Sequence, residues 1–423
     1  MLNFLVSLLD NAAVVLAIVV ALGLILDKRS LSEVIIGVIK TLLGYLVLSA
    51  GSSLICTALS SFSGVFTEAF SLTGFVAEDN SLVAQAMSYS ASIGTTTSMI
   101  MVLSFVVNLI IARVSPWKYV FLTGHMMLSM AGTMAIVLDQ MGITGWTAII
   151  IGSLVQGACQ VLFPAIAQPH IREISGQDSV AYGFWGSGLT WICGVIGGLV
   201  GNKEKSAEEI KVPNSLAFLK DMSVLMGVVM IAVYELVFII AGNGIVSAYS
   251  GGTNLVIYAA DQALQFVAGT LILLQGVRMF LGEIVPAFKG ISTRLIPGAR
   301  PALDVPFIYS YGPVSTTLGF LMAMAGGILA TAISTKMSAT ILPSVIGLYF
   351  MGGAAGVFGN KKGGLVGCLV AGFALGFLFS IIPVLFYNVV DLTKYGISGL
   401  WFASTDSIVV MVIMRYIGKI FGL

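Results

Sequence analysis

A proline-rich stretch near residue 300 carries the side chain best suited to ligand binding. Residues 296–313 read IPGARPALDVPFIYSYGP, with four prolines in a chain of which only 9% of the residues are charged. Proline lacks a backbone N–H and clashes with the preceding turn, so this stretch cannot be a continuous helix. Asp304 lies at the break, where its carboxylate could accept hydrogen bonds from ligand hydroxyls. Alternatively, Asp304 pairs with Arg300 and only holds a hairpin.

A histidine and a serine form a second candidate pair. His125 and Ser129 lie in the segment TGHMMLSMAG, four residues apart, in a run that is otherwise apolar. Residues at this spacing share one face of a helix, so the pair would present two hydrogen-bonding groups together. A lone histidine in such a run can equally be structural.

Two further polar stretches interrupt apolar runs. Residues 168–191, QPHIREISGQDSVAYGFWGSGLTW, suggest a re-entrant hairpin whose tip near Phe184 and Trp185 exposes backbone N–H groups and aromatic faces. Such a tip would suit a carbohydrate, or it is ordinary membrane packing. The second stretch, VAEDNSLVAQ, places Asp79 and Asn80 ahead of a predicted span, as ligand contacts or as helix caps.

No catalytic or metal-binding motif is evident. The four cysteines are scattered singly in apolar runs, there are two histidines, and no phosphate-binding glycine motif is present. We therefore expect no metal, no cofactor and no self-contained catalytic site. The formal net charge of +1 implies no nucleic-acid partner.

The elements that must position these residues are transmembrane helices. The chain has 423 residues, 58% of them hydrophobic, and apolar runs long enough to cross a bilayer recur throughout. We predict an all-α polytopic membrane protein with about 11 transmembrane helices. A polar connector at about 201–220 divides two related halves, about 1–200 and 221–423.

Two segments, residues 60–87 and 283–295, are too polar or too interrupted to span, and one falls in each half. Matched breaks of this kind are typical of transporters built from repeats, with the substrate site at the breaks. Basic residues follow the first span directly, which predicts an outside N-terminus and a cytoplasmic first loop.

Four separated blocks of sequence resemble one family. QGVRMF, EIVPAFKGISTRLIPGARPALDVPFIYSYGP, LTGHMMLSMAG and GNKEKSAEEIKVPNSLAFLKD are similar to the ascorbate-type membrane component IIC of the bacterial phosphoenolpyruvate-dependent sugar phosphotransferase system (PTS). The resemblance runs from about residue 30 to 365. It implies a homodimer in which a V-motif domain and a core domain, with two re-entrant hairpins and interfacial amphipathic helices, move in an elevator-like cycle.

The same resemblance assigns substrate-binding roles. Asp304 falls on the family's binding aspartate and His125 on its histidine. Ser129 stands where the ascorbate carriers have glutamine. The remaining differences are Gly183, Phe184 and Trp185 in place of a Gly-His-Gln run, and Asp79 and Asn80 in place of a Thr-Tyr pair. Because several contacts change together, ascorbate is only one candidate beside a pentose, a polyol or a sugar-acid lactone.

The resemblance also implies partners and a location. The chain would be a permease in the bacterial inner membrane, surrounded by lipid, that works with separate IIA and IIB proteins and has no fused IIA or IIB domain. It would be the translocating subunit of a phosphotransferase complex without catalytic residues of its own, so its standing as an enzyme is uncertain. The main alternative is an ion-coupled secondary transporter of a small organic solute, in which Asp304 with Glu78 or Asp79 binds the ion.

Overall fold

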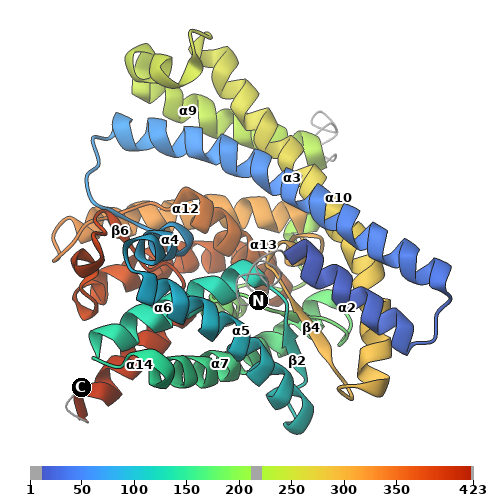
Figure 1. The fold of residues 1–423 in the computed structure, drawn as a ribbon. Helices are drawn as coiled ribbons and strands as arrows, with labels where there is room; N and C mark the ends of the chain where they lie inside the picture. The colour runs from blue at the N-terminus through green and yellow to red at the C-terminus, as the bar shows by residue number, and fades with distance from the viewer. Residues whose placement is uncertain (1–11, 211–221, 421–423) are drawn as a thin grey trace.

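The computed structural model describes residues 12–210 and 222–420, which are mostly α-helical (Figure 1). In these residues, 7 helices are long and apolar enough to cross a membrane, and two shorter apolar helices accompany them. The prediction of an all-α polytopic membrane protein is confirmed at this level. The predicted number of about 11 spans is not: 7 candidates are found in the described residues.

A first group of helices packs mainly within itself and occupies the upper and right-hand part of Figure 1. Its members are α2 (Ala12–Leu26), α3 (Leu31–Ala69), α9 (Met222–Ser250) and α10 (Leu255–Arg294). Glycines allow these helices to approach closely. A Cβ on Gly51 would lie 2.3 Å from the backbone nitrogen of Leu273, and one on Gly276 would lie 2.2 Å from that of Leu48. Small residues serve this purpose in membranes, where dispersion contacts replace the hydrophobic effect.

The remaining helices form a second group. They are α4 (Asp79–Tyr89), α5 (Ala91–Val114), α6 (Gly124–Gln140), α7 (Gly145–Ser175), α8 (Ser187–Val200), α11 (Pro306–Tyr309), α12 (Pro313–Ser334), α13 (Val345–Leu385) and α14 (Thr405–Ile420). Helix α13 folds back on itself at Gly363 and Gly364, whose φ angles are −136° and +60°. A Cβ on Gly359 would lie 2.3 Å from the carbonyl oxygen of Gly367, so the two arms of α13 are antiparallel neighbours.

Six short strands, which the sequence analysis did not predict, form two parallel sheets in the described residues. They are β1 (Phe75–Ala77), β2 (Tyr119–Phe121), β3 (Ala181–Tyr182), β4 (Arg300–Leu303), β5 (Ile341–Leu342) and β6 (Leu400–Trp401). The sheet orders are β5-β1-β6 and β2-β4-β3. Strand β1 of the N-terminal half therefore pairs with two strands of the C-terminal half, and β4 of the C-terminal half pairs with two strands of the N-terminal half.

The breaks in the helices lie at other residues than the sequence predicts. Residues 60–69 continue helix α3, and only the later part of the 60–87 segment breaks, into β1 and α4. The expected break at 283–295 is wrong, because α10 continues through Pro286 to Arg294. Part of the predicted connector, 211–220, lies outside the described residues. The described part of the connector contacts α13 near its bend, where the backbone N–H of Ala207 donates a hydrogen bond to Asn360 Oδ1 over 2.7 Å.

Carboxylates from distant parts of the chain accept hydrogen bonds from the first backbone N–H groups of helices in the second group. Glu208 accepts hydrogen bonds from the backbone N–H groups of Val314 and Ser315, at the start of α12, over 3.1 and 2.8 Å. The first N–H groups of a helix have no partner within it and carry partial positive charge, so a carboxylate there stabilises the start.

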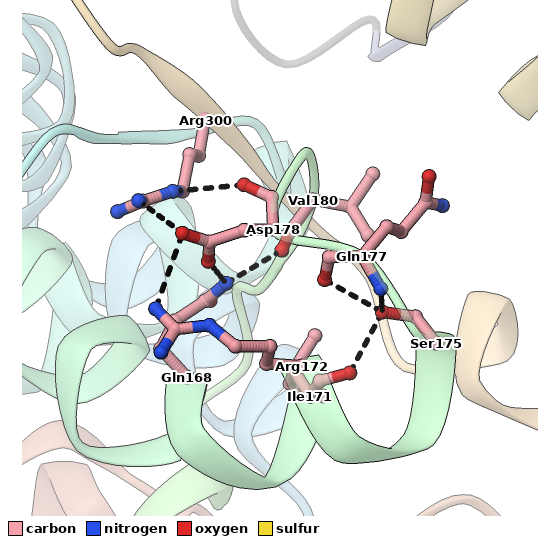
Figure 2. A network of polar contacts seen from close by, with 8 residues as sticks. All are labelled: Gln168, Ile171, Arg172, Ser175, Gln177, Asp178, Val180 and Arg300. Atoms are coloured by element: carbon pink, nitrogen blue, oxygen red, sulfur yellow. Dashed lines mark hydrogen bonds and ion pairs between the residues drawn. The ribbon is translucent and has the colours of Figure 1, made fainter.

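A network around Asp178 joins three segments of the second group (Figure 2). Asp178 accepts hydrogen bonds from Gln168 Nε2 over 2.8 Å and from Arg172 Nη2 over 3.1 Å, and it pairs with Arg300 of β4. The backbone N–H of Arg300 donates to the carbonyl of Lys118 over 2.7 Å. Arg300 is thus engaged by Asp178, which removes the alternative that Arg300 pairs with Asp304.

This network makes stability depend on pH. Burial opposes ionisation of Asp178, but hydrogen bonds from Gln168 and Arg172 and the charges of Arg300 and Arg172 outweigh it and hold the pKa of Asp178 below its usual range. A carboxyl whose pKa is lowered by folding adds stability above its unfolded pKa of about 3.9, and that stability is lost as the pH falls through the folded value.

We predict that Asp178→Asn lowers the unfolding free energy at pH 7 by up to about 1 kcal/mol, the usual limit for a partly exposed ion pair. Thermal unfolding of the purified protein measures this effect. The difference from the wild type should shrink as the pH falls toward 3, because the wild-type carboxyl is then protonated. A difference that stays constant over this range would contradict the assignment.

Candidate functional site

A cavity of about 610 Å³ lies between the two groups of helices. Helix α3 of the first group lines one side, and the residues that follow β1, β3 and β4 line the other. Each central strand ends at an acidic side chain of the cavity wall: Glu78 follows β1 and Asp304 follows β4. Irregular backbone at membrane depth is tolerated where it lines a cavity, so the breaks after β1 and β4 suit a binding site.

Asp304 and His125 face one another in this cavity. Asp304 Oδ2 and His125 Nε2 lie 3.8 Å apart, and the side chains of Asp304 and His125 are 34% and 44% exposed. This distance is too long for a hydrogen bond, so both groups retain capacity for a ligand. Asp304 Oδ1 accepts the backbone N–H of Val305 over 2.7 Å, which fixes the carboxylate orientation.

The start of α4 supplies the opposite part of the wall. Glu78 caps this helix by accepting the N–H groups of Asn80 and Ser81 over 3.0 and 2.7 Å. Asp79 is buried and accepts the N–H groups of Ala403 and Ser404 over 2.9 and 3.0 Å, together with the Ser404 hydroxyl. Asp79 therefore lines the cavity but already has its partners, whereas the exposed Asn80 side chain remains available to a ligand.

The predicted aromatic tip has two distinct parts. Phe184 is half-buried, and its ring lies edge-on to His125 with centroids 6.5 Å apart. Trp185 is fully buried, stacks on Phe121 at 4.6 Å and donates its indole N–H to the carbonyl of Met126 over 2.5 Å. Phe184 thus presents a ring to the cavity, while Trp185 fixes the tip in place.

Two predicted residues lie outside the cavity wall. Gly183 bonds to its neighbours: its N–H donates to the carbonyl of Leu303 over 2.8 Å, and its carbonyl accepts the Thr123 hydroxyl over 2.7 Å. A Cβ there would lie 2.6 Å from the carbonyl oxygen of Ala302, so the position requires glycine. Ser129 is fully buried. The cavity is lined by the other six predicted residues: Asp304, His125, Asp79, Asn80, Phe184 and Trp185.

A polar face of α3 was not predicted from the sequence. Ser52, Cys56, Ser60 and Ser63 all line the cavity. Their spacing of three or four residues places them on one helix face, and this spacing within an apolar run is a signal that could have been found. The face lies opposite Asp304 and His125, on the other group of helices.

Asp406, which lies behind the aromatic tip, was also not predicted from the sequence. Asp406 is buried and accepts hydrogen bonds from the N–H of Gly188 over 3.1 Å and from the Ser187 hydroxyl over 3.2 Å, at the start of α8. It therefore supports the helix that follows Phe184 and Trp185. No local motif marks this role, because Asp406 is more than 200 residues from its partners.

The cavity wall is acidic. It contains the carboxyl groups of Glu78, Asp79 and Asp304 and one histidine, and neither lysine nor arginine is among its lining residues. In residues 12–210 and 222–420, no group of three His, Cys, Asp or Glu side chains is placed to hold a metal ion. The arrangement suits hydrogen bonding to a polar, hydroxyl-rich ligand.

Comparison with known proteins identifies similar sequences. The family model described as "EIIC-GAT: PTS system sugar-specific permease component" matches residues 7–406. A curated relative, the "Ascorbate-specific PTS system EIIC component" of Mycoplasma pneumoniae (strain ATCC 29342 / M129 / Subtype 1), is 27% identical over 434 residues. The match covers 90% of this chain and 65% of the relative.

We predict that replacing Asp79 lowers the stability of the protein much more than replacing the adjacent Asn80 does. Asp79→Ala leaves three donors near residues 403 and 404 without an acceptor, and each unpaired buried group costs about 1–3 kcal/mol. Asn80→Ala removes no bond of its side chain, so stability should change by less than about 0.5 kcal/mol. Thermal unfolding of both variants provides the measurement, and equal melting temperatures would contradict these roles.

Proposed function

Because the chain belongs to the family of PTS system sugar-specific permease components, we propose that it carries L-ascorbate or a related small carbohydrate across the membrane. The protein is a multi-pass protein of the bacterial inner membrane. The observation that carries the proposal is the cavity at the ends of β1 and β4, where Asp304, His125 and Asn80 have hydrogen-bonding capacity beside the ring of Phe184.

The chemistry of the wall favours an uncharged substrate. A carboxylate accepts hydrogen bonds from hydroxyl groups, and an aromatic ring packs against the apolar face of a sugar. An anion would instead meet the carboxylates of Glu78, Asp79 and Asp304 without a lysine or arginine to offset them. L-Ascorbate is an anion at neutral pH, so we expect a pentose, a polyol or an uncharged lactone to bind more tightly than ascorbate does.

The position of the cavity also supports a transport mechanism. One wall belongs to α3 of the first group, and Asp304, His125 and Phe184 belong to the second. In an elevator-like cycle the second group would move past the first and carry the bound substrate. The substrate would then lose its contacts with the serines of α3 and face another part of the first group. We propose that a separate IIB protein, supplied by IIA, then phosphorylates the substrate, and that the permease acts as a homodimer.

The test of this function is uptake into vesicles that contain the purified protein. We expect accumulation of a phosphorylated substrate only when phosphoenolpyruvate, enzyme I, HPr, IIA and IIB are supplied on the cytoplasmic side. The alternative, an ion-coupled carrier using Asp304 with Glu78 or Asp79, predicts uptake of unmodified substrate that an ionophore abolishes. Uptake that does not require the phosphoryl donor but requires the ion gradient would refute the phosphotransferase proposal.

We predict that Asp304→Asn weakens binding of the best uncharged ligand by about 10- to 100-fold, because hydrogen bonds to a charged group contribute about 1.5–3 kcal/mol. Calorimetry with a panel of L-ascorbate, pentoses, hexitols and lactones measures this. Asp261→Asn is the matched control, because Asp261 is an exposed residue of α10 outside the cavity wall. Equal losses in both variants, or none in Asp304→Asn, would place the ligand elsewhere.

Cys56 offers a direct test of occupancy. It is a half-buried residue of the cavity wall, whereas Cys159, Cys193 and Cys368 are buried elsewhere. We expect a small thiol reagent to modify Cys56 first and a bound ligand to slow this reaction at least several-fold. Mass spectrometry of the modified peptides measures the rate, and Cys56→Ser provides the background. Ligand-independent modification of Cys56 would show that the ligand does not occupy this cavity.

A further inference from the structure

A second hollow, separate from the carbohydrate cavity, lies between the two groups of helices. It has a volume of about 530 Å³ and is formed by α2 and α10 of the first group and α5 of the second. Its walls are apolar, with Leu22 on α2, Leu109 on α5 and Phe288 on α10 among the lining residues. Several of these side chains, including Ile18 and Ile110, are about half exposed, so the hollow is open to the membrane.

One end of this hollow, called the groove below, is positively charged. Arg113, in the last turn of α5, is the one charged residue among those that line the groove. Lys118 lies beside it, since Lys118 Nζ donates to the carbonyl of Arg113 over 3.0 Å. No carboxylate within residues 12–210 and 222–420 forms an ion pair with Arg113. The neighbouring Trp117 is 46% exposed, as is typical of tryptophan at a membrane–water interface.

The charged end lies on the basic side of the protein. The backbone carbonyl of Lys118 accepts the backbone N–H of Arg300, and the Arg300 and Arg172 side chains both pair with Asp178. The adjacent Glu173 pairs with Lys362. An excess of basic residues marks the cytoplasmic side of a membrane protein, and the cytoplasmic leaflet is rich in anionic lipids.

We propose that this groove binds one anionic phospholipid, with an acyl chain along the apolar wall and the phosphate group held by Arg113 and Lys118. The apolar length, the unpaired guanidinium at one end and the interfacial Trp117 match the two chemical parts of such a lipid. The lipid would lie between α5 and the α2–α10 pair, so it would fill a seam between the two groups of helices.

The experiment is native mass spectrometry of the full-length protein, delipidated and then exposed to phosphatidylglycerol or phosphatidylcholine with identical acyl chains. We expect phosphatidylglycerol to be retained preferentially. Arg113→Gln should weaken its retention about five- to tenfold, since a basic group near an anionic surface contributes about 1 kcal/mol and close pairing adds to this. Lys336→Gln, which removes one exposed positive charge outside the groove, is the matched control and should change nothing.

A second variant tests the apolar part independently of charge. Leu109→Trp should obstruct the groove and reduce retention of both lipids, while thermal unfolding confirms that the variant is folded. Equal retention of the two lipids by the wild type, or identical retention in Arg113→Gln and Lys336→Gln, would overturn the proposal. Occupation of the groove by a second copy of the chain would also overturn it, and cross-linking through a cysteine placed at Ile110 would reveal that arrangement.

Discussion

Helices that begin inside the protein impose the main constraint on this fold. Their first N–H groups cannot reach water, and an unpaired group in an apolar environment is costly. Asp406 satisfies the start of α8 and Glu208 the start of α12, while Asp79 bonds to the segment that leads into α14. All three carboxylates act on a segment far away in sequence, and the bonds of Asp406 and Asp79 also join the two halves of the chain.

The exchange of strands between the halves explains where the site lies. Each half contributes the central strand of one sheet and the two outer strands of the other. Such reciprocity is what two related halves would produce, and it brings the breaks after β1 and β4 to the same cavity. Glu78 and Asp304 occupy equivalent places after these strands, but Glu78 caps its own helix while Asp304 faces His125.

The sequence predicts the class of fold and much of the site, because its strongest signals are local. Asp304, His125 and Phe184 stand out as polar or aromatic residues in broken apolar runs, and all three line the cavity. The short strands were not predictable, since two to four residues carry no useful periodicity. The supporting role of Asp406 and the hydrogen bonds that occupy the Asp79 carboxylate involve partners more than 200 residues away. One sequence does not reveal such partners. The predicted break at 283–295 was wrong because α10 continues through this basic run, and membrane helices tolerate a proline such as Pro286.

The reciprocal sheets have a consequence for biogenesis. When the N-terminal half has been synthesised, β1 has neither of its neighbours, and β2 and β3 lack the strand that separates them. Strand β6, at Leu400–Trp401, completes the first sheet only after the whole of α13 has been synthesised. The edges of β1 therefore stay unpaired until β5 and β6 have been synthesised, and unpaired strand edges are sites of misassembly. The two sheets are thus completed only after the helices of the N-terminal half have been synthesised.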